Sequence, residues 1–467
     1  MRRAPLLAVS LLGLSCASAA RTGGFPFNVI RKVKAAAHPP VLVSRAPLGS
    51  VSVSKYRLGN GLEVILAPDP SATSVAYTTW FRVGSRHENA AAGETGLAHL
   101  FEHLMFTQTK GAKEAGDFDR RMEEVGGNVN AMTSYDFTAY TDDMPPDALP
   151  LAITMEADRM VNLALTKKQV ETEREVVVEE RLSTVEDSVE GLLDEMMHLE
   201  AFKSHPYRFP VIGLMKDIKG VTTEKALSFY RTYYAPNNAV VVVAGKLDEA
   251  ATLTAIDKAY GALGASKPPA ETASAERAPS AAVRAEVERP VPADRFVLGL
   301  PAPALAHADR AAYELLAEIL AGGPSSRLYR RLVVEDELAS SISGDVPPTR
   351  DPSIYGLWVQ MTKGHTVAEA EAVIEPELLR LATEPVPAAE LDKARAQLET
   401  AFWRGLTSSE GRADRLGEFE VCAGDYRKLL ERAPEYGKVT AEDLSRVAAS
   451  YFASGARALF VAKPKPE

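Results

Sequence analysis

The sequence predicts an α+β protein made of two similar halves, each a mostly antiparallel sheet packed against helices. Alternating or β-branched runs, such as residues 75–83 and 137–141, are interleaved with long helical segments such as residues 167–193. An internal duplication is the second observation supporting this prediction. The third is a segment between the halves that is rich in Ala, Pro, Ser and Glu. Together these features indicate two globular domains joined by a linker.

The first residues have the pattern of a targeting signal. Two arginines precede an apolar run over residues 4–14, and Ala17-Ser18-Ala19 offers small residues for cleavage, as in a secretory signal peptide spanning residues 1–19. We therefore expect export to a bacterial periplasm, with no transmembrane span after signal removal, because the run is short for a bilayer. Cys16 is a candidate lipid anchor. The lack of acidic residues before Glu63 also fits a mitochondrial transit peptide and a location in the matrix.

Four further segments are expected after the signal. Residues 20–51 contain a proline pair and no clear apolar period, which indicates a tether. An N-terminal domain over residues 52–263 precedes a linker over residues 264–286, and a second domain fills residues 287–467. The formal net charge of −10 gives no sign of a nucleic-acid-binding protein.

The duplication appears as a constant offset between the two domains. Residues 221–224 resemble residues 439–442, which lie 218 positions later, and the same offset carries residues 233–235 onto residues 451–453. Matching segments at a fixed spacing indicate that the second domain repeats the first.

The chemistry is predicted by a His-Leu-Phe-Glu-His box inside an otherwise apolar stretch. On a helix, His99, Glu102, His103 and Phe106 share one narrow arc. Two imidazoles at positions i and i+4 can converge on one ion, usually Zn²⁺, and Glu102 beside them can take a proton from a water molecule. A surface helix with one polar stripe would give the same pattern. Burying two imidazoles and a carboxylate is costly, however, unless a metal satisfies them.

The third protein ligand is expected on a later, highly acidic helical segment. Most of its carboxylates belong to a solvated face. Glu173 and Glu180 differ, because at helical spacing they fall on the arc that also carries Val170, Val176 and Val177. A carboxylate on an apolar stripe needs a positive partner. We therefore assign Glu180 as a ligand and Glu173 as a carboxylate that orients a histidine or the ligand itself.

These motifs together resemble the pitrilysin/insulinase family of zinc endopeptidases, which includes the mitochondrial processing peptidases. The box is followed 77 residues after its second histidine by Glu180. Residues 126–134 are similar to the family's Gly-Gly-x-x-Asn-Ala-x-Thr strand. The Tyr-Tyr-Ala-Pro-Asn-Asn segment at residues 233–238, followed by a run of valines, is also similar. The resemblance runs from about Tyr56 to the C-terminus.

The resemblance implies a role for each site residue. One zinc ion per chain would be held by three side chains: His99, His103 and Glu180. Glu102 would be the general base, and Asn130 and Ala131 would lie on an edge strand that pairs with the substrate backbone. Phe106 would line a pocket for an apolar side chain. The residues alone leave other interpretations open, with Asn130 as a turn residue and Phe106 as part of the core.

The duplication predicts that the second domain has no metal site, since the offset places His99 over Ala317 and His103 over Ala321. In the resembling family, four such domains enclose a clamshell chamber. One chain of this length would therefore supply half of a chamber.

One family feature is missing. Members that complete their own site carry a second-half segment resembling Leu-Arg-Glu-x-x-Gly-Leu-Ala-Tyr, but here Val333 replaces the arginine and Ser340 the tyrosine. Losing a donor aimed at a developing oxyanion costs about 10²–10³ in turnover. We expect a heteromer in which a homologous subunit supplies the Arg/Tyr pair, unless another donor compensates.

The expected function is a zinc-dependent endopeptidase that cleaves short or unfolded peptides. A closed chamber excludes folded proteins, and strand pairing reads the substrate backbone more than its side chains. One alternative is a non-catalytic scaffold or binding subunit of the same family, which would not need the four polar site residues. Another is a zinc hydrolase of non-peptide substrates, which the resemblance disfavours.

Overall fold

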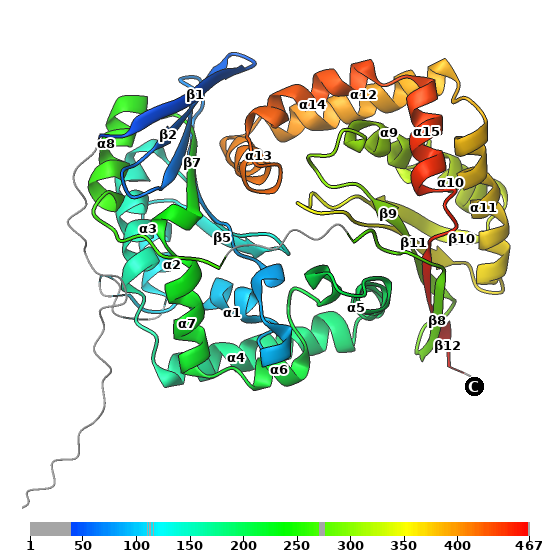
Figure 1. Ribbon diagram of the computed structural model, residues 1–467, viewed down its shortest axis with the longest axis horizontal. Helices are drawn as coiled ribbons and strands as arrows, with labels where there is room; N and C mark the ends of the chain where they lie inside the picture. The colour runs from blue at the N-terminus through cyan, green and yellow to red at the C-terminus, as the bar shows by residue number, and fades with distance from the viewer. Residues whose placement is uncertain (1–38, 110, 112–113, 115, 270–275, 466–467) are drawn as a thin grey trace, which may run out of the picture.

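The computed structural model describes residues 39–109, 111, 114, 116–269 and 276–465. The predicted signal peptide and most of the predicted tether lie outside these residues. The described chain forms two α+β halves that face each other (Figure 1). This confirms the predicted fold class. No helix among the described residues is both long enough and apolar enough to cross a membrane.

The first half is built on a seven-stranded sheet. Its neighbouring strands are antiparallel except for the central pair β3 and β7, which is parallel. In spatial order the strands are β1 (Val41–Leu48), β2 (Val51–Arg57), β3 (Glu63–Pro68), β7 (Ala239–Gly245), β4 (Val75–Phe81), β6 (Thr138–Met144) and β5 (Asn128–Thr133). Strand β5 is one edge of this sheet.

Eight α-helices belong to the first half within the described residues. They are α1 (Leu97–Leu104), α2 (Asp117–Glu123), α3 (Leu149–Asn162), α4 (Lys167–Arg181), α5 (Val189–Ala201), α6 (Met215–Lys219), α7 (Thr223–Tyr233) and α8 (Glu249–Tyr260). Most of them pack on one face of the sheet around a single apolar core. Helix α5 is the exception.

The second half is built on a five-stranded sheet. In spatial order the strands are β10 (Ala339–Asp345), β11 (Ser353–Met361), β9 (Arg295–Ala302), β12 (Ala458–Pro464) and β8 (Val283–Arg289). Its described helices are α9 (Arg310–Ala321), α10 (Arg327–Tyr329), α11 (Val367–Thr383), α12 (Ala388–Gly405), α13 (Ser409–Cys422), α14 (Arg427–Lys438) and α15 (Ala441–Tyr451).

The two sheets have the same topology. The order β5-β6-β4-β7-β3 in the first sheet matches the order β10-β11-β9-β12-β8 in the second. In each series the only parallel pair is the last one, β7 with β3 and β12 with β8. The repeated sequence also has a repeated structural role, since Thr222 caps α7 and Thr440 caps α15 through the side chain. Strands β1 and β2 have no counterpart in the second sheet. The internal duplication predicted from the sequence is therefore present in the fold.

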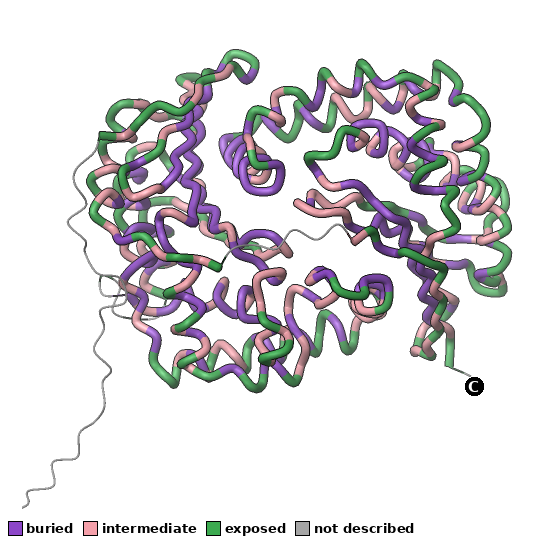
Figure 2. Tube along the Cα trace, viewed as in Figure 1, coloured by how far each residue is buried: buried purple, intermediate pink, exposed green. Residues whose placement is uncertain are grey.

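The open face of each sheet is covered by a helix that belongs to the other half. Helix α13 packs on the first sheet, where Leu416 and Phe419 share an apolar core with Val240. Helix α5 packs on the second sheet, where Met197 lies in a core with Val297. Figure 1 shows α13 and α5 between the halves, and Figure 2 shows that α13 is largely buried there. The exchange ties the halves together with apolar surface.

Ion pairs reinforce this contact. Glu420 of α13 receives the ammonium of Lys55 at 2.7 Å and the guanidinium of Arg82 at 3.2 Å. A further ion pair between the halves joins the guanidinium of Arg86 in the first half to the carboxylate of Asp351 in the second, at 2.7 Å. Because several of these groups are buried, an unpaired member would be costly, and the pairs favour one relative placement of the halves.

Three sequence-based boundaries were wrong. Strand β1 lies inside the predicted tether; most of its side chains are exposed on a sheet edge, so no buried alternation marks it. Strand β8 begins at Val283, inside the predicted linker. The single helix predicted over residues 167–193 is two helices, because Ser188 accepts a hydrogen bond from the amide of Gly191 and starts α5 anew.

Candidate metal centre

The N-terminus of α1 is fixed by a buried turn. Gly96 precedes the helix with φ +90°, and a Cβ there would lie only 2.6 Å from the carbonyl oxygen of Ile212. The carboxylate of Glu88 accepts hydrogen bonds from the amides of Gly96 at 2.8 Å and Ala98 at 2.7 Å. A side-chain carboxyl group at this position satisfies amides that have no partner within the helix.

The rest of α1 is anchored by its apolar side. The buried residues of the helix are Leu97, Ala98, Leu100, Phe101 and Leu104. The Phe101 ring stacks on Tyr230 with centroids 5.8 Å apart. This packing leaves the opposite side, with His99 and His103, facing α4. The helix ends at Leu104, so Phe106 lies in the following turn and not on the helix as predicted.

Helix α4 presents the acidic partners. Thr166 and Gln169 form a reciprocal capping box at its start, and Val170 and Val177 are buried against the first-half core. Val176, which the sequence placed on the same apolar arc, is 46% exposed. The arc that faces α1 is therefore narrower than predicted, but it still carries both Glu173 and Glu180.

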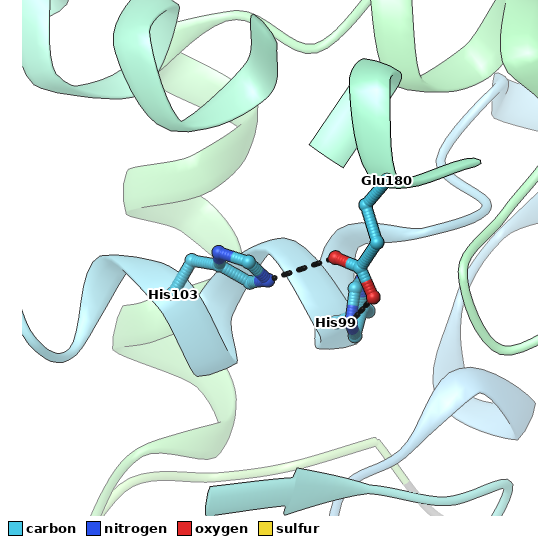
Figure 3. Close-up of side chains that lie close together, drawn as sticks. All are labelled: His99, His103 and Glu180. Atoms are coloured by element: carbon cyan, nitrogen blue, oxygen red, sulfur yellow. Dashed lines mark ion pairs between the residues drawn. The ribbon is translucent and has the colours of Figure 1, made fainter. Parts of the chain in front are cut away.

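The three predicted ligands converge. Figure 3 shows the rings of His99 and His103 and the carboxylate of Glu180 pointing toward one another. His99 Nε2 lies 3.6 Å from Glu180 Oε1, and His103 Nε2 lies 3.3 Å from Glu180 Oε2. One ligand atom from each residue lies within 4.8 Å of the other two, and this is the one such group found among the described residues.

The donor set fits zinc. Two imidazole nitrogens and one carboxylate oxygen are ligands that Zn²⁺ prefers, and three protein ligands leave a fourth position open. Metal–ligand bonds of about 2.0–2.1 Å in a tetrahedron place ligand atoms about 3.3 Å apart. The separation of 3.3 Å between His103 Nε2 and Glu180 Oε2 equals that spacing, and His99 Nε2 lies 3.6 Å from the other carboxylate oxygen, Oε1.

Glu173 lies where an orienting carboxylate is needed. Its Oε2 is 3.8 Å from Nδ1 of His103, the ring nitrogen that does not face Glu180. The corresponding nitrogen of His99, Nδ1, is buried and has no hydrogen-bond partner among the described residues. The two imidazoles therefore differ in their surroundings: His103 Nδ1 lies next to a second carboxylate, whereas His99 Nδ1 has no hydrogen-bond partner among the described residues.

The surroundings of the four groups shift their pKa values in different directions. Burial lowers the pKa of His99. Burial also lowers the pKa of His103, but the surrounding carboxylates, chiefly Glu180, outweigh it and raise that pKa overall. Contact with His103 lowers the pKa of Glu180, whereas burial raises the pKa of Glu173. Coordination requires neutral imidazoles and an ionised carboxylate. The lowered pKa values of His99 and Glu180 favour these forms, whereas the raised pKa of His103 makes its proton harder to displace by a metal.

Glu102 lies beside the three ligands and is held from the neighbouring strand. The hydroxyl of Thr133 in β5 donates a hydrogen bond of 2.6 Å to Glu102 Oε2. The sequence did not single out Thr133 as a site residue. The available signal was its place at the threonine of the Gly-Gly-x-x-Asn-Ala-x-Thr pattern.

Strand β5 also carries the two residues predicted to bind substrate backbone. It pairs with β6 on one side, and its other side has no strand partner among the described residues. Asn130 is exposed, and its side-chain Oδ1 accepts a hydrogen bond of 2.9 Å from the amide of Ala131. An edge of this kind can accept another strand.

A pocket of about 390 Å³ opens next to Glu102. Its lining residues come from α1 and the turn after it, from α2 and from the start of β5: Glu102, His103, Phe106, Asp119, Glu123, Gly127, Asn128, Val129, Asn130 and Ala131. Phe106, Asn130 and Ala131 all line this pocket; that Phe106 receives an apolar substrate side chain stays a prediction. Asp119 and Glu123 of α2 also line the pocket, and the sequence analysis did not predict them.

The second half offers no equivalent site among the described residues. The helix that corresponds to α1 is α9, which carries Ala317 and Ala321 at the positions matched to the histidines. Val333 packs against the second-half core. Ser340 donates its hydroxyl to the carbonyl oxygen of Gln360 at 3.2 Å. Neither residue has a long side chain that ends in a hydrogen-bond donor, as arginine and tyrosine have.

Comparison with known families identifies the class of protein. The insulinase (peptidase family M16) model matches residues 63–213, and the peptidase M16 inactive-domain model matches residues 220–398. The chain belongs to peptidase family M16.

Individual relatives cover most of the chain. It is 31% identical to the zinc protease PqqE of Helicobacter pylori over 85% of this chain and 89% of that protein. It is 28% identical to an uncharacterised zinc protease of Streptomyces coelicolor over 86% and 87% of the two chains.

Solved structures agree with the fold. The crystal structure of a protease from Helicobacter pylori matches with a TM-score of 0.83 and 30% identity, over 88% of this chain and 99% of that one. A peptidase M16 inactive domain from Pseudomonas fluorescens matches with a TM-score of 0.80 over 89% and 98%, at 16% identity, which shows the fold alone.

Proposed function

We propose that this protein is a zinc-dependent endopeptidase that cleaves short or unfolded peptides. The observation that carries the proposal is the convergence of His99, His103 and Glu180 next to Glu102, at the open edge of β5. The zinc-protease names of its relatives support the same conclusion.

The residues of the chain would divide the work as follows. Zinc held by His99, His103 and Glu180 would polarise the scissile carbonyl and acidify the attacking water. Glu102 takes a proton from that water and returns it to the leaving amine. The hydroxyl of Thr133 donates a hydrogen bond to Oε2 of Glu102. The other carboxylate oxygen of Glu102 is therefore the one that would accept the proton of the water.

The substrate would bind as an added strand on β5. Main-chain hydrogen bonds give affinity in this mode, and an extended peptide is required to form them. The side chain of Asn130 accepts from the amide of Ala131 in the free protein. An arriving peptide carbonyl would replace it at that amide. A folded protein rarely offers such an extended segment, so unfolded or short peptides are the expected substrates.

We further propose that a homologous subunit completes the site. Val333 and Ser340 stand where related proteins are expected to carry an arginine and a tyrosine. A partner with that pair would supply donors for the tetrahedral intermediate. Activity that rises about 100-fold when a homologous partner is added would support this. Full activity of the isolated chain would contradict it.

The test of the catalytic proposal compares the zinc-loaded wild type with Glu102→Gln on a library of quenched fluorescent peptides. We expect cleavage by the wild type, loss of it with a chelator, recovery with zinc, and a drop in kcat/KM of at least about 10³ for Glu102→Gln. Glu179→Gln, on the exposed side of α4, is the matched control and should keep full activity.

The alternative is a non-catalytic scaffold or binding subunit, and the missing donors at Val333 and Ser340 are the observation that favours it. A folded, zinc-loaded chain that cleaves no peptide with or without a homologous partner would establish this alternative. Identical behaviour of wild type and Glu102→Gln would have the same meaning.

A further inference from the structure

Helix α4 ends directly after the third predicted ligand. Glu180 is its second-last residue, and the chain then widens into a π-helical turn over Leu182–Glu186. The carbonyl oxygen of Glu180 accepts hydrogen bonds from the hydroxyls of Ser183 at 2.9 Å and Thr184 at 2.8 Å. The last turn of a helix lacks part of its internal hydrogen bonding and frays most easily. Because a metal ligand must be held to within about 0.5 Å, this end of α4 has to be fixed from outside the helix.

Arg181, the residue after the ligand, is fixed by buried contacts. It is 3% exposed. Its guanidinium donates a hydrogen bond of 2.7 Å to the carbonyl oxygen of Gly213, and its two terminal nitrogens lie 2.7 and 3.0 Å from the two carboxylate oxygens of Glu195 in α5. Glu186 lies farther away, at 3.4 Å, and its side chain is 45% exposed. Arg181 therefore depends on two main partners, one backbone carbonyl and one carboxylate.

The first partner belongs to the turn that starts the histidine helix. A Cβ on Gly213 would lie only 2.5 Å from the Cα and the backbone nitrogen of Gly96, so the two backbones are in direct contact. Gly96 is the residue that precedes α1, the helix that supplies both histidines. Arg181 thus joins the end of the helix that carries Glu180 to the beginning of the helix that carries the other two ligands.

The second partner is held by the second half of the molecule. Leu193 and Met197, which flank Glu195 in the sequence, are buried in the core that α5 shares with the second sheet. Helix α5 packs there against β9 and β12. The carboxylate that Arg181 contacts is therefore fixed by a half that has no metal site of its own among the described residues.

The geometry of these contacts requires arginine. A guanidinium presents several donors in a rigid planar fork, which can meet a carboxylate with two nitrogens and still bond a carbonyl oxygen. A lysine ammonium is a compact charge on a flexible stem and cannot reproduce the fork. Removing the carboxylate instead would leave a buried charge without its partner, so the surrounding structure would have to shift. In either case the last turn of α4 moves, and Glu180 moves with it.

We propose that Arg181 is a positioning residue that holds Glu180 at the distance from His99 and His103 that a metal requires. It acts through the backbone that it shares with Glu180 and is not itself a ligand. The inference rests on the proposed zinc site. It adds that the second half takes part in metal binding through Glu195.

The test measures zinc affinity and metal geometry in folded, full-length protein. Wild type, Arg181→Lys and Glu195→Gln are titrated with zinc against a chromogenic chelator, and the visible absorption of Co²⁺-loaded samples reports the coordination geometry. We expect each variant to bind zinc about tenfold or more weakly than the wild type and to lose absorption intensity typical of tetrahedral Co²⁺. Because both substitutions break the same contact, the double variant should bind zinc little more weakly than either single variant.

Two control variants separate positioning from general stability. Arg412 on α13 is also a buried arginine, paired with Asp69 at 2.6 Å, but its helix supplies no ligand. Arg412→Met should lower the unfolding temperature and leave the zinc affinity and the Co²⁺ spectrum unchanged. Glu186→Gln removes only the exposed partner of Arg181 and should bind zinc like the wild type.

Wild-type zinc affinity in folded Arg181→Lys and Glu195→Gln would overturn the assignment. An equal loss of affinity in Arg412→Met would also overturn it, since the effect would then follow from lower stability alone. If Arg181→Lys does not fold, Glu195→Gln decides by itself. A wild type that binds no zinc would contradict the proposed metal site and this inference together, whereas a zinc-binding wild type with unaffected variants would contradict only the role of Arg181.

Discussion

The contact between the halves can be tested at Gly417 in the middle of α13. This glycine lies under the indole of Trp80 in β4 of the first half. A Cβ added to it would sit 2.2 Å from Nε1 and 2.3 Å from Cε2 of that ring. Both distances are well below the closest approach that real Cβ atoms make, and Trp80 is 1% exposed, so the ring has no free space to move into.

The size of the effect follows from two opposing contributions. Alanine is favoured over glycine inside a helix by about 1 kcal/mol. Forcing a methyl group into a packed core costs about 1–3 kcal/mol and sometimes more. Because the indole must shift by most of an ångström against buried neighbours, the steric cost should prevail. Subtracting the helix gain from a steric cost near the upper end of that range, we expect Gly417→Ala to lower the free energy of unfolding by about 1–2 kcal/mol.

Urea unfolding followed by circular dichroism measures this change, and Gly437→Ala is its matched control. Gly437 lies in α14 and is exposed, and a Cβ added to it would point into open space. The control variant should therefore be as stable as the wild type or slightly more stable. If Gly417→Ala were also as stable as the wild type, α13 would not be pressed against the first sheet, and the helix exchange between the halves would be refuted.

Three more changes test the site and the contact between the halves. Thr133→Val removes the hydrogen bond to Glu102 and should lower kcat about 10- to 100-fold without changing zinc content; unchanged kcat would argue against a positioning role. Glu173→Gln should weaken zinc binding about tenfold in a chelator competition, since it lies next to His103. Burial raises the pKa of Asp414 on α13 from 3.8 to about 6. Its ionisation therefore lowers stability progressively from about pH 4 to 6 and fully above. Asp414→Asn should be about 1–2 kcal/mol more stable than the wild type at pH 7.5, and the gain should vanish near pH 4.

Much of the fold could be predicted because its signals are local. The capping threonines Thr222 and Thr440 mark the start of equivalent helices in both halves, and the valine-rich strand β7 is recognisable by its composition. The exchange of α5 and α13 could not be predicted. Both helices have an apolar side, and nothing in the amphipathic pattern says which of two similar sheets will cover it.

The site shows the same division between local and long-range information. The box itself places His99, Glu102 and His103 by helical spacing alone. The partnership of Glu102 with Thr133 depends on the approach of β5 to α1, which no periodicity encodes. The acidic character of the pocket depends in turn on α2, a short helix with no apparent motif.

Zinc binding by the full-length chain tests the central claim most directly. Competitive titration against a chromogenic chelator should give one zinc ion per wild-type chain, and Glu180→Gln should weaken the affinity at least about 100-fold. Glu179→Gln, its neighbour on the exposed side of α4, should bind like the wild type. If folded wild-type protein bound no zinc, or if Glu180→Gln bound it as tightly as Glu179→Gln, the metal centre at His99, His103 and Glu180 would be contradicted.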